Sequence, residues 1–298
     1  MFLNNFLSII ICCASLLFTS SYEINTNQSN QFNQFNQSNS YSLTIATNSV
    51  WLSGASYCDK DIYKTMSLGG PVTDFKLTDI IYDKKSDMQG YVGVLPSTKS
   101  IYVVFRGSSS TLNWLDDFEI ILIPYDTYPE CKCKVHTGFY HTTLAIKDQV
   151  IDAINKQKKI NPTYNIISTG HSLGAIISLM ISLELKKVGI NALTYNYGQP
   201  RGGDKIFASF VNSKLGLTNY YRFVHNKDMV PHVPPLSFGY YHSCTEIFEE
   251  DDDHNLITCS NINCEDPKCS NKYSINQFNT EDHSIYLTHT VSCSASIL

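Results

Sequence analysis

Apolar residues recur along the chain with two different periods, and these periods predict its helices and strands. Within 141–159, the residues Ile146, Val150 and Ile154 repeat at helical spacing. Shorter apolar runs rich in β-branched residues, such as SIYVVF over 100–105, predict buried strands. The expected helices cover 50–64, 141–159 and 175–188, and the expected strands cover 79–83, 88–95, 100–105, 164–168, 192–197 and 220–225. Because helices alternate with strands, we expect an α/β fold with a mostly parallel central sheet flanked by helices.

The N-terminus has the pattern of a targeting segment. An apolar run over 6–18 is followed by small residues at 19–21, which predicts a secretory signal peptide over 1–21. No Lys or Arg precedes the run, and the alternative is an uncleaved anchor, although the run is short for a membrane span. We therefore expect a secreted protein with no transmembrane segment in its mature form.

A polar tract follows the predicted signal peptide. Residues 22–46 are rich in Asn, Gln and Ser and have too little apolar surface for a core, which predicts a disordered leader. Asn27 and Asn36 are glycosylation acceptors within it. The remaining residues, 47–298, are expected to form one folded domain.

Composition narrows the function classes. The chain has 298 residues, of which 43% are hydrophobic and only 16% are charged, and its formal net charge is -5. No long basic run is present, so binding to nucleic acid has little electrostatic support.

Ten cysteines are present, and two of them lie in the predicted signal peptide. An even number in the remainder of a secreted chain favours disulfides, whose pairing the spacing alone does not fix. A metal site in CSNINCEDPKC is the alternative, but its cysteines lack a C-x-x-C pair, so no metal is expected. The disulfide candidates are Cys58, Cys131, Cys133, Cys244, Cys259, Cys264, Cys269 and Cys293.

The stretch TGHSLGA over 169–175 matches G-x-S-x-G, a pattern that can place a nucleophilic serine on a sharp strand-to-helix turn. A predicted strand precedes it and a predicted helix follows. Gly170 and Gly174 would then permit a close strand–helix approach and a strained backbone at Ser172. At the start of the helix, the N–H of Leu173 would point to where an oxyanion develops. The alternative is that Ser172 only caps the helix.

A serine hydroxyl needs an acid–base pair to react, and in α/β-hydrolases the acid and then the histidine follow the serine in the chain. Asp228 comes after a predicted strand, in a Pro-rich turn, and is the expected acid. Two other acidic features have simpler interpretations: Asp204 as a helix cap, and the run 249–253 as a solvated loop.

Three histidines, His254, His283 and His289, come late enough in the chain to be the base. We favour His283, which opens the short apolar segment SIYL, over His289 nearer the C-terminus. His171 adjoins the serine on the same turn and cannot easily face its hydroxyl, so we expect it to be a packing residue.

Taken together, the motifs FRGSSS, NWLDD, VHTGFY, TGHSLGA, YGQPRGGD, HNKDMVPHVPP, FGYYHS and DHSIYL make the chain similar to the fungal-type class 3 lipases, a branch of the α/β-hydrolases. The resemblance covers about residues 50–293. It implies that Ser172, Asp228 and His283 are the nucleophile, acid and base. It also implies that Ser108 supplies the second oxyanion donor and that Asp117 supports the serine at that position.

The resemblance further implies a lid over 109–118, with an ordinary amphipathic surface helix as the alternative. The apolar lid residues would be Leu112, Trp114, Leu115 and Phe118. Cys58 and Cys293 match a disulfide of the family. The chain departs from the family pattern at Cys131 and Cys133 and in the acidic, cysteine-rich insertion 249–273, which leaves the substrate open.

These observations predict a secreted serine hydrolase that cleaves lipid esters, foremost triacylglycerol, at a lipid–water interface and without a metal or organic cofactor. Three alternatives remain on the same fold: a phospholipase A1, a feruloyl-type esterase, and a non-catalytic secreted binding protein. A cysteine-stapled structural protein is disfavoured by the alternation of helices and strands.

Overall fold

The structure is a computed structural model that describes residues 41–110, 120–250 and 255–293. The predicted signal peptide, most of the predicted leader, the lid residues (Leu112, Trp114, Leu115 and Phe118) and Asp117 lie outside the described residues. The described residues belong to one compact unit.

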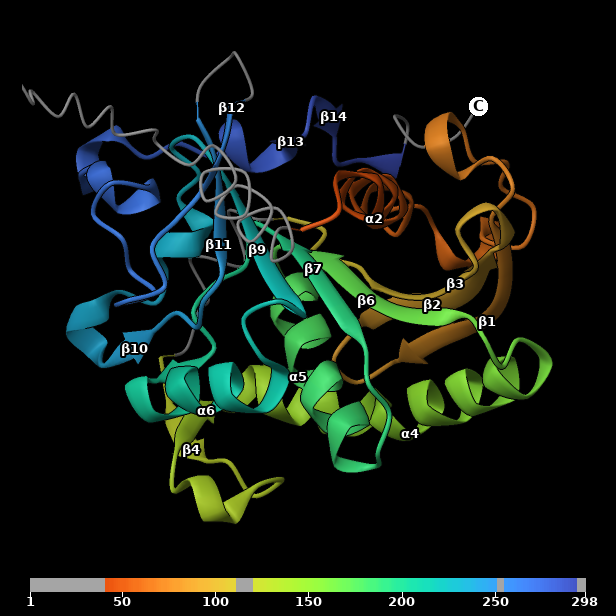
Figure 1. Cartoon of the computed structure of the whole chain (residues 1–298), viewed down its shortest axis with the longest axis horizontal. Coiled ribbons are helices and arrows are strands. Elements are labelled where there is room, and N and C mark those ends of the chain that lie inside the picture. Colours follow the sequence, from red (N-terminus) through yellow and green to blue (C-terminus); the bar gives the residue numbers. More distant parts are fainter. Residues whose placement is uncertain (1–40, 111–119, 251–254, 294–298) are drawn as a thin grey trace, which may run out of the picture. The chain divides into compact units, whose positions relative to one another are not determined.

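An eight-stranded sheet forms the centre of this unit, in the order β1-β2-β3-β6-β7-β9-β11-β12 (Figure 1). The strands are β1 (Lys76–Asp83), β2 (Met88–Leu95), β3 (Ser100–Phe105), β6 (Asn165–His171), β7 (Leu193–Tyr197), β9 (Tyr220–His225), β11 (Glu246–Glu250) and β12 (Asn255–Thr258). The strands from β3 to β11 pair in parallel, and β1, β2 and β12 join the two edges antiparallel. The prediction of a mostly parallel α/β sheet flanked by helices is therefore confirmed, and the fold is that of an α/β-hydrolase.

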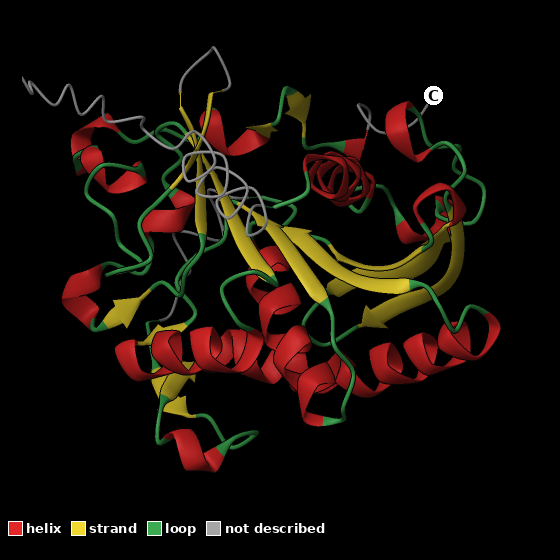
Figure 2. Ribbon diagram, in the orientation of Figure 1, coloured by secondary structure: helices red, strands yellow, loops and turns green. Residues whose placement is uncertain are grey.

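Helices cover both faces of the sheet (Figure 2). Helix α2 (Leu43–Ala55) lies on one face, and α4 (Thr137–Ile160), α5 (Leu173–Lys187) and α6 (Lys205–Leu215) lie on the other. A second sheet contains β10 (Tyr240–Tyr241), β8 (Gly203–Asp204), β5 (Lys134–His136) and β4 (Leu122–Pro124), and a hairpin contains β13 (Ile285–Tyr286) and β14 (His289–Thr290). Single-turn 3-10 helices cover Lys60–Ile62, Gly70–Val72, Pro96–Thr98, Pro129–Cys131, Val230–His232, Leu236–Phe238, Ser270–Lys272, Ile275–Gln277 and Asp282–Ser284.

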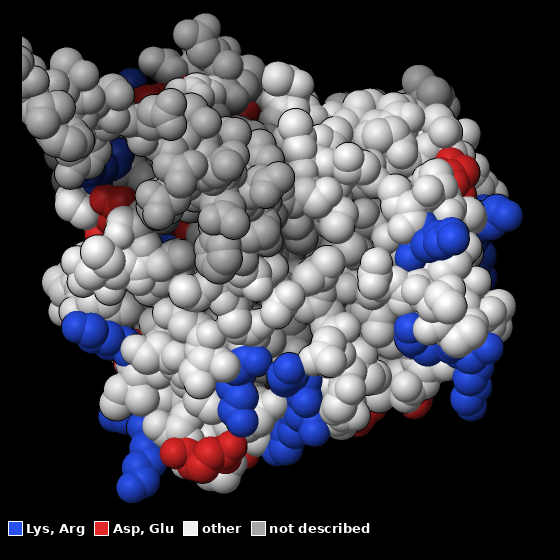
Figure 3. Space-filling view, in the orientation of Figure 1, with Lys and Arg blue, Asp and Glu red and all other residues white. Residues whose placement is uncertain are grey.

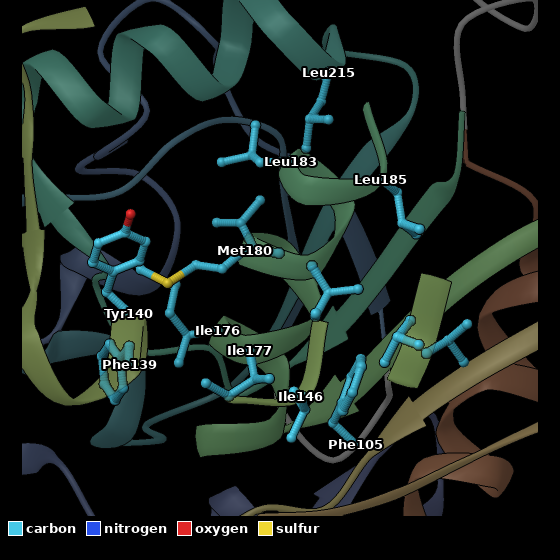
Figure 4. Close-up of a cluster of buried hydrophobic side chains, with 14 of the residues drawn as sticks. Phe105, Phe139, Tyr140, Ile146, Ile176, Ile177, Met180, Leu183, Leu185 and Leu215 are labelled. Atoms are coloured by element: carbon cyan, nitrogen blue, oxygen red, sulfur yellow. The ribbon is translucent and has the colours of Figure 1, made fainter. Parts of the chain in front are cut away.

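The core on the α5 side is an apolar layer between the sheet and helices α4 to α6 (Figure 4). Ile176, Ile177, Met180 and Leu183 of α5 are at most 1% exposed, and Phe105 of β3 is fully buried against the same layer. Burying each such side chain contributes about 1.5–3 kcal/mol. This packing fixes the start of α5 at the carboxyl end of β6.

The first helix differs from its prediction. Helix α2 begins at Leu43 and ends at Ala55, so the helix predicted over 50–64 is displaced, and the folded part begins before residue 47. The reason is local: the Ser42 hydroxyl accepts a hydrogen bond from Ile45 N–H and caps the helix. Ala46 is fully buried, so it belongs to the core and not to the leader.

The acidic run also differs from its prediction. Glu249 is fully buried in β11, and both of its carboxylate oxygens lie 2.9 Å from Leu287 N–H. A buried carboxylate requires such hydrogen bonds, which come from a distant part of the chain. Residues 251–254, which include His254, lie outside the described residues.

The eight candidate cysteines form four disulfides in the structure. They are Cys58–Cys293, Cys131–Cys133, Cys244–Cys264 and Cys259–Cys269. The first is the pair that the family resemblance implies, and it ties the segment after α2 to the end of the described chain.

Among the helices of the described residues, none combines the length and the apolar character that crossing a membrane requires. On the face in Figure 3, Lys and Arg side chains lie mainly along the lower and right-hand margins, and uncharged residues cover most of the area between them.

Candidate active site

Ser172 occupies a sharp turn between β6 and α5. Its backbone has φ 58° and ψ −128°, a conformation that non-glycine residues rarely adopt. Two hydrogen bonds hold this geometry: Ser172 N–H donates to Tyr197 O at 2.9 Å, and Ala175 N–H donates to Ser172 O at 3.0 Å. Ser172 occupies the N-cap position of α5, but its side chain makes no capping hydrogen bond. The side chain is therefore not used as a cap.

Gly170 and Gly174 allow the strand and the helix to approach closely, as expected. A Cβ on Gly170 would lie 2.3 Å from Gly174 O, and a Cβ on Gly174 would lie 2.2 Å from Phe105 O. Both distances are far shorter than a van der Waals contact distance. The atoms concerned belong to the backbone, which cannot move freely. The two glycines are thus a steric requirement of the turn that presents Ser172.

His283 and Asp228 form a buried pair. His283 Nδ1 lies 2.8 Å from Asp228 Oδ2, and the two side chains are 2% and 0% exposed. Asp228 Oδ1 accepts a hydrogen bond of 2.8 Å from Val230 N–H, and Oδ2 also accepts one from the Tyr286 hydroxyl. A carboxylate that accepts from Nδ1 leaves Nε2 of the neutral imidazole as a free base.

Asp228 remains ionised despite its burial. Burial acts to raise the pKa of its carboxyl, but the attraction of a positive charge when His283 is protonated and the hydrogen bonds from His283, Tyr286 and Val230 outweigh this effect, so the pKa lies below its usual range. An ionised Asp228 can orient His283 and stabilise its protonated form.

The segment that carries His283 is fastened to the turn that carries Asp228. Lys227 N–H donates to Asp282 Oδ2 at 3.0 Å, and Asn279 Nδ2 donates to the same oxygen at 2.9 Å. Met229 N–H donates to Asn279 O at 3.1 Å. These contacts fix Asp228 and His283 relative to each other although they lie 55 positions apart in the chain.

Two reactive atoms remain without a partner. Ser172 Oγ and His283 Nε2 are buried, and neither has a hydrogen-bond partner among the described residues. The two atoms lie in the same part of the structure. Ser172 N–H donates to Tyr197 O, and Gly198, which follows Tyr197, packs against the His283 ring. A buried polar atom normally finds a partner, so this pair is available to a bound substrate.

The carboxyl end of β3 lies beside the serine. A Cβ on Gly107 would lie 2.9 Å from the Ser172 Cβ, and Ser108 follows it, partly exposed. Leu173 is the first residue of α5, where backbone N–H groups have no intrahelical acceptor. Both residues proposed as oxyanion donors therefore adjoin Ser172. Asp117 lies outside the described residues.

The remaining candidates have other positions. The His289 ring stacks on Trp51 at a centroid distance of 4.2 Å, and burial lowers its pKa to about 4. Asp204 caps α6 by accepting from Phe207 N–H at 2.7 Å, as expected. Glu246, Cys259 and Cys269 have ligand atoms within 4.8 Å of one another, but the two sulfurs are bonded to each other.

Two further residues contact the pair and carried no predicted role. Gly198 has φ +56°, and a Cβ there would lie 2.7 Å from the His283 ring and 2.9 Å from Asp228 Oδ2. Tyr286 donates to Asp228 from three positions beyond His283, within DHSIYL. Both residues lie in motifs recognised in the sequence, but only their spatial contacts reveal what they do.

Comparisons with known proteins identify relatives in both sequence and fold. The family model for "Lipase (class 3)" matches residues 102–238. The chain is 34% identical over 242 residues to a lipase of Rhizomucor miehei. This aligned region covers 78% of this chain and 61% of that protein. It is 35% identical over 162 residues to a secreted mono- and diacylglycerol lipase of Fusarium solani, covering 54% of this chain and 47% of that protein. The chain thus spans less than two thirds of the length of these relatives.

Solved structures agree more completely. The triacylglyceride lipase of Rhizomucor miehei superposes with a TM-score of 0.77 at 31% identity, covering 85% of this chain and 98% of that one. A triacylglycerol lipase described as having a serine protease triad at its catalytic centre superposes with a TM-score of 0.77 at 30% identity, covering 84% and 96%. Sequence, fold and site geometry together lead to one conclusion: the chain belongs to the class 3 lipase family.

Proposed function

We propose that this protein is a secreted serine hydrolase that cleaves carboxylic esters of lipids, with triacylglycerol as its main substrate. One observation carries the proposal: the buried Asp228–His283 pair leaves Nε2 unpartnered in the neighbourhood of the strained, unpartnered Ser172. A nucleophile, a base and an acid in this arrangement are sufficient for acyl transfer.

The chemistry proceeds in two halves. In the first, Ser172 Oγ attacks the ester carbonyl while His283 Nε2 accepts its proton, and the same proton then passes to the departing alcohol. This leaves an acyl group on Ser172. In the second, His283 takes a proton from water, the hydroxide attacks the acyl carbonyl, and His283 returns the proton to Ser172 as the fatty acid leaves. Asp228 stabilises the imidazolium in both halves. These steps use protein groups and water alone.

The oxyanion that develops in each half needs donors already in place. We assign this role to the backbone N–H groups of Leu173 and Ser108, which adjoin Ser172 from α5 and from the end of β3. Losing one such donor typically reduces kcat by roughly 10²–10³-fold.

We propose in addition that residues 109–118 act as a lid, with Leu112, Trp114, Leu115 and Phe118 meeting a lipid surface and Asp117 supporting Ser108. The burial of Ser172, only 1% exposed, is consistent with a site that must open. The rate on a short-chain triacylglycerol should then rise sharply above its solubility limit; a smooth saturation curve through that limit would contradict the lid.

A substrate panel tests the proposed function. Purified protein is given emulsified triacylglycerol, mono- and diacylglycerol, phospholipid, feruloyl ester and soluble short-chain ester, and Ser172→Ala is the matched control. We expect the highest kcat/KM on triacylglycerol. A higher kcat/KM on phospholipid or feruloyl ester would identify that ester as the main substrate instead. Absence of Ser172-dependent hydrolysis for every ester in the panel would favour a non-catalytic binding protein.

Secretion is the proposed location, since the apolar run over 6–18 precedes a chain with four disulfides. N-terminal sequencing of protein from the medium should begin after residue 21; a retained N-terminus in a cell-associated protein would contradict it.

A further inference from the structure

The side chain of His171 has specific hydrogen-bond partners on both ring nitrogens. Its Nδ1 lies 2.6 Å from the Tyr57 hydroxyl, and its Nε2 lies 2.7 Å from the backbone oxygen of His283. The residue is 3% exposed. His171 therefore does more than the packing role that its sequence position suggests.

These partners determine where the proton of His171 resides. The carbonyl oxygen of His283 can only accept, so Nε2 carries the proton. In a neutral ring Nδ1 must then accept, so the Tyr57 hydroxyl donates to it. Burial, together with the repulsion from a protonated His283, lowers the pKa of His171 to about 3, so the ring is neutral at ordinary pH.

The Tyr57 hydroxyl also packs against the segment that follows β3. A Cβ on Gly107 would lie 2.1 Å from the Tyr57 oxygen. Gly107 directly precedes Ser108, which is the residue assigned as an oxyanion donor.

The neutral state of His171 also matters to the base. The rings of His171 and His283 lie 4.2 Å apart between centroids, with an interplanar angle of 34°. During ester cleavage His283 gains a positive charge, and a second charge at this distance would oppose it. By donating to Nδ1, the Tyr57 hydroxyl opposes a second proton on His171 and so favours the neutral ring.

We propose that Tyr57 and His171 are positioning residues for the reaction. The Tyr57 hydroxyl packs against Gly107 and donates to His171, and His171 donates to His283 O. These contacts tie the residue before the proposed oxyanion donor Ser108 to the residue that carries the proposed base, and so fix the distance between two parts of the machinery that act on one ester group. This inference rests on the proposed hydrolase function.

The test compares Tyr57→Phe, His171→Gln and the double variant. Each single change breaks the series of hydrogen bonds without removing a reacting group, so kcat should fall roughly tenfold to a hundredfold while KM changes less than about twofold. Because both changes break the same series, the double variant should lose much less than the product of the two single losses.

Tyr91→Phe is the matched control. Tyr91 is fully buried whereas Tyr57 is partly buried, and the Tyr91 hydroxyl donates to Leu52 O at 2.6 Å. Tyr91→Phe should lower the melting temperature by an amount similar to Tyr57→Phe and leave kcat unchanged. The proposal would be overturned if kcat fell in proportion to the melting temperature in all variants, Tyr91→Phe included. It would also be overturned if the loss of kcat in the double variant equalled the product of the two single losses.

A measurement that needs no activity separates this proposal from the hydrolase function. Nitrogen-15 NMR of the wild-type imidazoles should show His171 as the neutral tautomer protonated on Nε2, and Tyr57→Phe should shift its Nδ1 resonance. A proton on Nδ1 of His171, or no shift of its Nδ1 resonance in Tyr57→Phe, would overturn the positioning role of Tyr57 and His171 even if esters are cleaved. If the tautomer is as stated but no ester is cleaved, the hydrolase function fails instead.

Discussion

At the scale of single residues, the glycine at 198 illustrates how an absent side chain can position a base. Gly198 has a left-handed backbone conformation, and its Cα packs against both His283 and Asp228. Any Cβ there would overlap the imidazole ring, so the backbone of this turn serves as the wall against which the ring rests.

Gly198→Ala tests this role. The methyl group must displace His283, so kcat should fall by roughly a hundredfold, since small misplacements of a reacting group have effects of that size. Gly189→Ala is the control, because Gly189 also has a positive φ (+83°) but has nothing within 4 Å of its added Cβ. Both variants should lose some stability through backbone strain. Equal kcat values for the two variants would refute the role of Gly198.

Sequence reasoning at this scale is strongest for residues whose pattern is local. The G-x-S-x-G turn and its flanking elements indicate Ser172, and chain order then favours Asp228 and His283, which the structure brings together as a hydrogen-bonded pair. Tyr286 and the two partners of His171 depend on contacts between segments over 50 residues apart, for which the sequence carries no periodic signal.

At the scale of elements, strands were the easier part to predict. Strands β2, β3 and β9 begin and end at their expected residues, because buried strands read as continuous apolar runs between polar turns. The helix α2 was harder, since its N-terminal half follows a polar tract and is defined by the Ser42 cap and by its burial.

The disulfides close loops of very different lengths. Cys58–Cys293 joins residues 235 apart, whereas Cys131–Cys133 joins residues two apart. Restricting the unfolded chain is the main entropic effect of a disulfide, and it grows with loop length. Replacing Cys58 and Cys293 by Ser should lower the free energy of unfolding by about 5 kcal/mol. The Cys131, Cys133 double replacement should cost clearly less in the same urea titration; equal losses would contradict this.

At the scale of the whole molecule, buried histidines make stability depend on pH. Burial and the nearby Arg222 hold the pKa of His242 well below its usual 6.5, and burial with Arg201 lowers the pKa of His232 to about 4. In the unfolded chain both rings take up protons near pH 6.5. Below that pH the unfolded state binds more protons than the folded state, so stability must fall as the pH falls.

We therefore expect the free energy of unfolding to decrease from pH 7 to pH 5. His242→Gln keeps a donor for Pro231 O, which His242 Nε2 contacts at 2.6 Å, and removes one titrating group. Its slope between pH 6 and 5 should be smaller by about 1.4 kcal/mol per pH unit. His141→Gln, at an exposed position of α4, is the control variant measured beside it. A wild-type slope in His242→Gln would show that this histidine is not the cause.

The central claim is that Ser172 forms an acyl-enzyme, and covalent trapping tests it most directly. The protein is incubated with a long-chain alkylphosphonate ester, which stops at the tetrahedral adduct, and peptides are then mapped by mass spectrometry. We predict one adduct, on Ser172, formed together with the loss of ester hydrolysis and absent from Ser172→Ala. An adduct on another residue, or hydrolysis by Ser172→Ala at the wild-type rate, would contradict the account.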